Sequence, residues 1–100
     1  TSHAQLACNA AGPSLAAFCR TLRPYVRHLH LSDAEGLGEE GLQIGDGEID
    51  WRTVLEVFRH YDGTMTPEIW QGHLENGKGF LIALERLAPY FARARAEATV

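Results

Sequence analysis

The sequence predicts a small α/β protein with parallel strands, and three observations support this fold class. Segments of strand and helix periodicity alternate in the order helix, strand, helix, strand, helix. Strands separated by a helix usually pair in parallel through a right-handed crossover. Hydrophobic residues make up 45% of the 100 residues, which is enough to bury a core.

The first helix is predicted over residues 13–22. Pro13 suits the first turn of a helix, and Pro24 cannot continue one. The apolar positions between them recur at the spacing of one helical face. This stripe consists of Leu15, Phe18, Cys19 and Leu22.

The first strand is predicted over residues 26–31 because apolar residues alternate there with polar ones. Side chains alternate across a strand, so His28 and His30 share one face and the leucines share the other. Five glycines then punctuate residues 34–49, and we predict a long loop.

The second half of the chain repeats this order. Asp50 is a predicted N-cap for a helix over 51–60. A strand is predicted over 64–69, where Pro67 is tolerable only near the strand end. A final helix is predicted over 77–96, with a buried stripe of Phe80, Leu81, Leu84, Leu87, Ala88 and Phe91.

Two parallel strands do not form a stable sheet alone, so residues 1–100 are expected to be part of a larger domain. The net charge of −4 argues against nucleic-acid binding, and no apolar run reaches the ~20 residues of a membrane span. Cys8 and Cys19 lack zinc-site spacing. They are predicted to be buried thiols of a cytoplasmic protein.

Three segments carry a family resemblance: residues 28–34 (HLHLSDA), 41–51 (GLQIGDGEIDW) and 67–73 (PEIWQGH). Together they resemble the xylose isomerase-like TIM-barrel superfamily of sugar isomerases, epimerases and endonuclease IV-type enzymes. The nearest resemblance is to sugar phosphate isomerase/epimerase-type domains associated with sialic-acid-like (nonulosonate) synthesis. It implies the C-terminal part of a TIM (β/α)8 barrel, from the end of strand six through helix eight.

The resemblance implies a divalent metal ion held by His30 after strand seven and Glu68 after strand eight. An imidazole and a carboxylate on adjacent parallel strands can also converge on one ion, and mixed N/O ligation suits Mn, Co, Mg or Zn. Without the resemblance, His30 would be interpreted as a core histidine. Glu68 has a stronger case, because an inward carboxylate would be costly to bury without a cation; its alternative is an exposed carboxylate just past the strand end. His28 lies deeper in the strand and is predicted to pack or to support His30.

The resemblance also suggests residues that contact substrate. His3 matches the last member of the Asp-x-x-His motif that ends strand six in the family. Asp33 could touch substrate, hold His30, or simply make a turn. Trp70 and His73 could line a sugar pocket or close the end of the barrel. The glycine-rich residues 45–47 could bind phosphate, although a loop that needs positive φ angles is preferred.

These residues leave three functions to compare. The first is a metal-dependent sugar or sugar-phosphate isomerase/epimerase, with Glu68 as ligand and base. The second is an abasic-site endonuclease; the places of its two further ligands hold Glu39 and Gly41, and the acidic charge disfavours DNA. The third is a non-catalytic barrel domain beside a fused synthase. The parent protein is expected to be an enzyme, whereas residues 1–100 alone are expected to be inactive. For its assembly, a homo-oligomer and a fused synthase domain both remain open.

Overall fold

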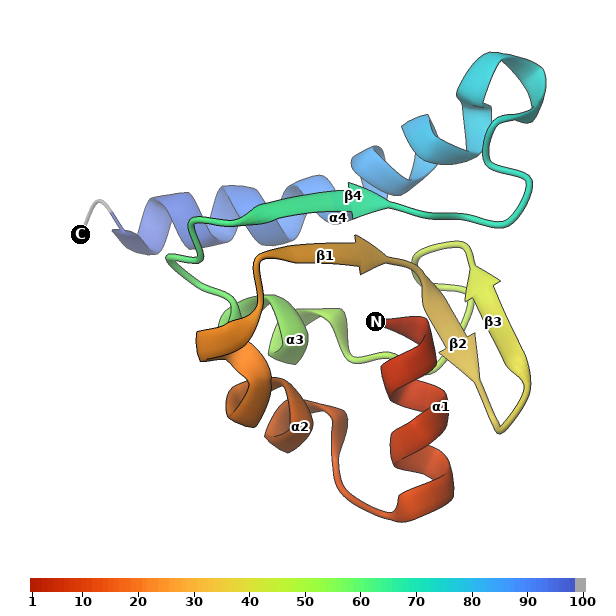
Figure 1. Ribbon diagram of the computed structural model, residues 1–100. Coiled ribbons are helices and arrows are strands. Elements are labelled where there is room, and N and C mark those ends of the chain that lie inside the picture. Colours follow the sequence, from red (N-terminus) through yellow and green to blue (C-terminus); the bar gives the residue numbers. More distant parts are fainter. Residues whose placement is uncertain (99–100) are drawn as a thin grey trace.

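The structure is a computed structural model that describes residues 1–98, and the side chains of residues 1–92. It is a mixed α/β structure, as predicted. Figure 1 shows β1 and β4 side by side with their arrowheads at the same end, and β2 and β3 as a separate hairpin beyond that end. In chain order the elements are α1 (Ser2–Ala11), α2 (Leu15–Leu22), a 3-10 helix (Arg23–Tyr25), β1 (His28–Leu31), β2 (Asp33–Glu35), β3 (Glu39–Leu42), α3 (Trp51–Val57), β4 (Thr64–Pro67) and α4 (Leu74–Ala98).

The parallel pairing of β1 with β4 confirms the central prediction from the sequence. His28 pairs with Thr64 and His30 pairs with Thr66. Side-chain alternation places the leucines of β1 against the core, where Leu31 is almost fully buried. Both strands are shorter than predicted. Strand β1 begins two residues later and ends at Leu31 as predicted, whereas β4 ends two residues earlier, at Pro67, whose missing N–H suits the strand end.

Helix α1 was not predicted, because residues 1–3 were assigned to the end of a strand by resemblance. The helix begins at Ser2 and ends at Gly12, whose φ of 101° forms a left-handed C-cap. Its apolar residues are mostly alanines, which give a weak amphipathic pattern. Only Ser2 and Cys8 of this helix are buried, so tertiary contacts rather than periodicity decide where it lies.

Capping side chains set the starts of α2 and α3. The Ser14 hydroxyl accepts a hydrogen bond from the Ala17 N–H at 3.1 Å, so α2 starts at Leu15 and Pro13 lies outside it, contrary to the prediction. Asp50 caps α3 as predicted, because its carboxylate accepts from the Thr53 hydroxyl and N–H. These two hydrogen bonds hold the pKa of Asp50 below its ordinary value. Helix α3 ends at Val57, three residues earlier than predicted.

The predicted loop over residues 34–49 is wrong in its first half, because β2 and β3 form an antiparallel hairpin there. Gly36 opens the turn between them with a φ of 66°, and Gly41 has the same φ within β3. The strands are short and rich in acidic and glycine residues, so their composition hid them. Helix α1 packs against this hairpin.

Helix α4 buries only part of the predicted stripe: Leu87 is buried, and Phe80 and Phe91 pack against the core, whereas the other predicted positions are exposed. Ala83 and Leu87 are buried, whereas Leu81 and Leu84 are 63% and 53% exposed, and Ala88 is exposed too. A Cβ on Gly79 would come within 2.6 Å of the Gly72 Cα, so the helix approaches its neighbour closely through its small residues. Residues 75–77 have left-handed φ values, and the regular helix begins after them, near the predicted start.

The buried core contains residues from all four α-helices described above and from β1. Cys8 and Cys19 are buried free thiols, as predicted, and burial raises the pKa of the Cys19 thiol. Within residues 1–98, no helix is both long and apolar enough to span a bilayer. The buried apolar cluster comprises Cys8, Leu15, Cys19, Leu31, Ile44, Ile49, Trp51, Val54, Leu55, Phe58, Ile69, Ala83 and Leu87.

Candidate functional site

The carboxyl ends of β1 and β4 bring His30 and Glu68 together. The Glu68 N–H donates to the Leu31 carbonyl at 2.9 Å, so the ladder continues one residue beyond β4. This extension places the Glu68 carboxylate next to the His30 ring, and its Oε2 contacts Nδ1 of the imidazole. Both side chains are more than half exposed, at 56% and 61%. The two residues predicted as metal ligands are therefore direct neighbours on an accessible surface.

His28 continues this polar face toward the other end of the strands. Its Nδ1 lies 2.5 Å from the Thr64 hydroxyl, which belongs to its register partner. Its ring meets the His30 ring edge to face, with centroids 4.8 Å apart and planes at 89°. His28 is exposed, so it does not pack in the core, which was one of its two predicted roles.

The remaining predicted residues lie outside this pair. His3 stands on α1 and contacts Glu40 of β3, and its side chain is 80% exposed. Trp70 is 75% exposed, and its N–H donates to the Gly41 carbonyl at 2.8 Å. His73 is exposed in the turn that precedes α4. Among the described contacts, none joins these three side chains to His30 or Glu68.

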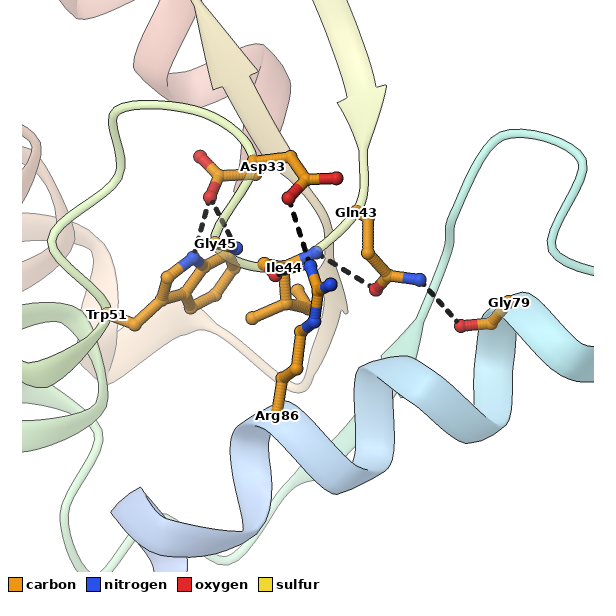
Figure 2. A network of polar contacts seen from close by, with 8 residues as sticks. Asp33, Gln43, Ile44, Gly45, Trp51, Gly79 and Arg86 are labelled. Atoms are coloured by element: carbon orange, nitrogen blue, oxygen red, sulfur yellow. Dashed lines mark hydrogen bonds and ion pairs between the residues drawn. The ribbon is translucent and has the colours of Figure 1, made fainter.

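Asp33 is fully buried and acts as an anchor for the glycine-rich segment. Its Oδ1 accepts from the Ala34 and Ile49 N–H groups, at 2.9 and 3.0 Å. Its Oδ2 accepts from the Gly45 N–H and the Trp51 indole N–H, both at 2.9 Å (Figure 2). Four donors therefore surround the carboxylate, and its exposed fraction is 0%.

This arrangement corresponds to the turn interpretation of Asp33 and leaves no exposed surface for a substrate. The hydrogen bonds around this segment also argue against the alternative that residues 45–47 bind phosphate. The Gly45 N–H donates to the Asp33 carboxylate and the Asp46 N–H donates to the Gln43 carbonyl, so two of the three N–H groups of this segment are not available to an anion. A Cβ on Gly47 would come within 2.5 Å of the Asp33 Oδ1 and 2.4 Å of the Ala34 carbonyl oxygen, so Gly47 permits close packing.

Two side chains that the sequence did not point to attach the same segment to α4. The Gln43 amide donates to the Gly79 carbonyl at 2.9 Å and accepts from the Ile44 N–H at 3.0 Å. Arg86 donates to the Ile44 carbonyl at 2.8 Å and to the Asp46 carboxylate at 3.0 Å (Figure 2). These contacts span about 40 residues of sequence, so no local pattern predicts them.

A model of the family described as xylose isomerase-like TIM barrel matches residues 1–90. The chain belongs to this xylose isomerase-like TIM barrel family. No curated protein and no solved structure matches it. The match covers the β1–β4 pair, the anchored segment and most of α4.

The described residues bring together few side chains that could bind a metal ion. In the part of the chain that the structure describes, no group of three or more His, Cys, Asp or Glu side chains could hold an ion. The His30 and Glu68 pair supplies one nitrogen and one carboxylate oxygen, which are donor types that Mn²⁺, Co²⁺, Mg²⁺ and Zn²⁺ accept. The residues present therefore fit one side of a metal site and leave its other positions to water or to further donors.

Proposed function

We propose that the protein to which these residues belong is a metal-dependent sugar or sugar-phosphate isomerase or epimerase, and that residues 1–100 are the C-terminal part of its barrel. The observation that carries the proposal is the contact between His30 and Glu68 at the carboxyl ends of adjacent parallel strands. In TIM barrels this end of the strands carries the catalytic side chains. Family membership supports a sugar isomerase or epimerase and also an endonuclease IV-type enzyme.

The chemistry of the pair suits proton transfer beside a carbonyl group. A bound divalent ion would polarise the carbonyl oxygen of the substrate. His30 and Glu68 would be two of the side chains that hold that ion. The exposed Glu68 carboxylate would also take the proton from the adjacent carbon as a general base. The ends of rigid parallel strands hold both groups without help from a mobile loop.

A sugar would lie over the face that His28, His30 and Thr66 present. The exposed Trp70 indole would stack on the apolar face of the sugar ring. His3 and His73 would contact hydroxyl or phosphate groups, as their exposure allows. We leave Asp33 out of the substrate site because it is buried. The finer assignment to sialic-acid-like synthesis, beside a fused synthase, rests on the three segments of resemblance.

Solvent-proton exchange in the full-length protein tests the proposal. Incubation with Mn²⁺ and a panel of ketoses, aldoses and their phosphates in D₂O should introduce deuterium at the carbon next to the carbonyl, detected by proton NMR. Glu68→Gln should lower the exchange rate at least about 100-fold, because a positioned base contributes ~10²–10⁴-fold. His30→Ala should weaken Mn²⁺ binding in calorimetry. Glu85→Gln, on the exposed side of α4, is the matched control and should exchange normally.

Other results would exclude the isomerase. Cleavage of an abasic-site duplex without sugar exchange would identify the nuclease instead. Absence of both activities, with Mn²⁺ affinity unchanged in His30→Ala and Glu68→Gln, would leave the non-catalytic barrel domain.

A further inference from the structure

The polar face of the β1–β4 pair contains a continuous row of contacts that ends at Glu68. Thr64 contacts His28 through its hydroxyl, and His28 contacts His30 through its ring. His30 then contacts the Glu68 carboxylate. We propose that His28 is a positioning residue that fixes the ring of His30, and that the Thr64 hydroxyl holds His28 in place. This deepens the proposed function and rests on it for the role of His30.

Because the His30 side chain is exposed, a contact with another residue is needed to fix the orientation of its ring. His30 is not enclosed by a core that would select one ring orientation, because its side chain is 56% exposed. A terminal χ2 torsion is broad, so a free imidazole could turn either nitrogen toward Glu68. Contact with the His28 ring at 4.8 Å restricts that rotation. A ligand that is held in its binding orientation loses less conformational entropy when it binds an ion.

Thr64 is suited to be the fixed end of the row. Its β-branched side chain is stiff at χ1, so the hydroxyl occupies few positions. The parallel register places Thr64 directly beside His28, and Nδ1 of His28 lies 2.5 Å from Oγ1. This hydrogen bond occupies one ring nitrogen of His28. Loss of a direct partner of a metal-binding histidine lowers metal affinity about 10–100-fold. Thr64 is one contact further from the proposed ligand, because it acts on His30 through His28, so an effect near the lower end of this range is expected.

A direct ligand role for His28 is the competing interpretation. Within the described residues, His28 does not join His30 and Glu68 in a group that could hold an ion. Its Nδ1 is already hydrogen-bonded to Thr64. The geometry therefore indicates that His28 influences metal binding through His30 and not as a ligand itself.

Substitutions at Thr64 separate positioning from structure in the full-length protein. Thr64→Val removes the hydroxyl and keeps the β-branched shape, whereas Thr64→Ser keeps the hydroxyl. We expect Thr64→Val and His28→Ala to weaken Mn²⁺ binding about tenfold in calorimetry. Thr64→Ser should stay within about threefold of the unsubstituted protein. Thr21→Val, the same change on the exposed surface of α2, is the matched control and should bind normally.

The ring state of His30 is the second readout and needs neither metal nor turnover. In ¹⁵N-histidine NMR spectra of the metal-free protein, His30 should show one dominant tautomer, and Thr64→Val should give a mixture at an unchanged melting temperature. The proposal is overturned if Thr64→Val and His28→Ala keep both the Mn²⁺ affinity and the His30 tautomer of the unsubstituted protein. It is also overturned if Thr64→Ser fails to rescue either readout. If the unsubstituted protein binds no Mn²⁺, the proposed function fails, and the His30 tautomer alone decides this inference.

Discussion

At the residue scale, burial separates two acidic side chains that the sequence treats alike. Asp33 follows the first predicted strand and Glu68 lies near the end of the second, and both were candidates for the site. Asp33 is fully buried and accepts four hydrogen bonds, whereas the Glu68 side chain is 61% exposed and contacts His30. A buried carboxylate needs such donors to offset its desolvation. Asp33 is consequently bound within the protein, and the Glu68 carboxylate is accessible from solvent.

Replacement of Asp33 should test this difference. Asp33→Asn changes one acceptor oxygen into an NH₂ group that faces N–H donors, and it removes the charge. We expect the free energy of unfolding to fall by about 2–4 kcal/mol, since hydrogen bonds to a charged group contribute ~1.5–3 kcal/mol and a buried unsatisfied donor costs ~1–3 kcal/mol. Urea unfolding of the full-length protein measures the change. Asp46→Asn, on an exposed carboxylate, should change it by less than about 1 kcal/mol, and equal losses in the two variants would contradict the anchor role.

At the element scale, short capping and packing contacts decide where helices begin and which face they bury. Asp50 starts α3 as predicted, while Ser14 starts α2 two residues later than predicted. Helix α4 turns Ala83 and Leu87 inward because Gly79 allows a close approach to Gly72. Hydrophobicity alone placed Leu81 and Leu84 in the buried stripe with Leu87, whereas the structure buries Ala83 and leaves those two leucines exposed.

The Asp50 cap predicts a pH dependence. Hydrogen bonds from Thr53 hold the pKa of Asp50 below its unfolded value of about 3.9. A depressed folded pKa adds stability above the unfolded pKa, and this stability is lost as the pH falls through the folded pKa. Asp50→Asn keeps a capping acceptor without the charge. It should lower the free energy of unfolding by a few tenths of a kcal/mol at pH 7, with allowance for solvent screening.

Thermal unfolding of the full-length protein at pH 7 and at about pH 3 measures this effect. The difference between Asp50→Asn and the unsubstituted protein should shrink at the lower pH. Asp62→Asn, in the exposed turn before β4, controls for general charge effects. A difference of the same size at both pH values would show that the charge of Asp50 does not stabilise α3.

At the scale of the whole molecule, the described residues form a sheet of only two parallel strands. Strand β4 has a hydrogen-bonded neighbour on one side only within these residues. Leu81 and Leu84 present an apolar surface on α4, and Trp70 adds another. A closed barrel would cover the free edge of the sheet.

These open surfaces predict that residues 1–100, produced alone, are poorly stable and associate. Differential scanning calorimetry should show a broad transition, and sedimentation velocity should show mass that rises with concentration. Leu81→Glu combined with Leu84→Glu should reduce the association, because like charges on the exposed face of α4 repel. A cooperative transition from a monodisperse monomer would contradict this prediction.

The sequence by itself determined the features that depend on local pattern. Alternation over residues 26–31 and 64–69 predicted the two strands, and the helix between them predicted their parallel pairing, which puts His30 and Glu68 at the same end. Asp50 predicted the start of α3. These properties follow from side-chain alternation and capping, which act over a few neighbouring residues.

Only the tertiary structure decided the features that depend on distant contacts. The anchor at Asp33 and the attachment by Arg86 join residues that lie 12 to 42 positions apart, apart from the local bond to Ala34. The hairpin of β2 and β3 pairs residues only four to nine positions apart, but helix α1 packs against it from a different part of the chain. Their energies come from burial and from hydrogen bonds between segments, and a local window of sequence contains neither. For the same reason, the sequence named the members of the site, whereas the fold assigned Asp33 to the anchor and Glu68 to the accessible surface.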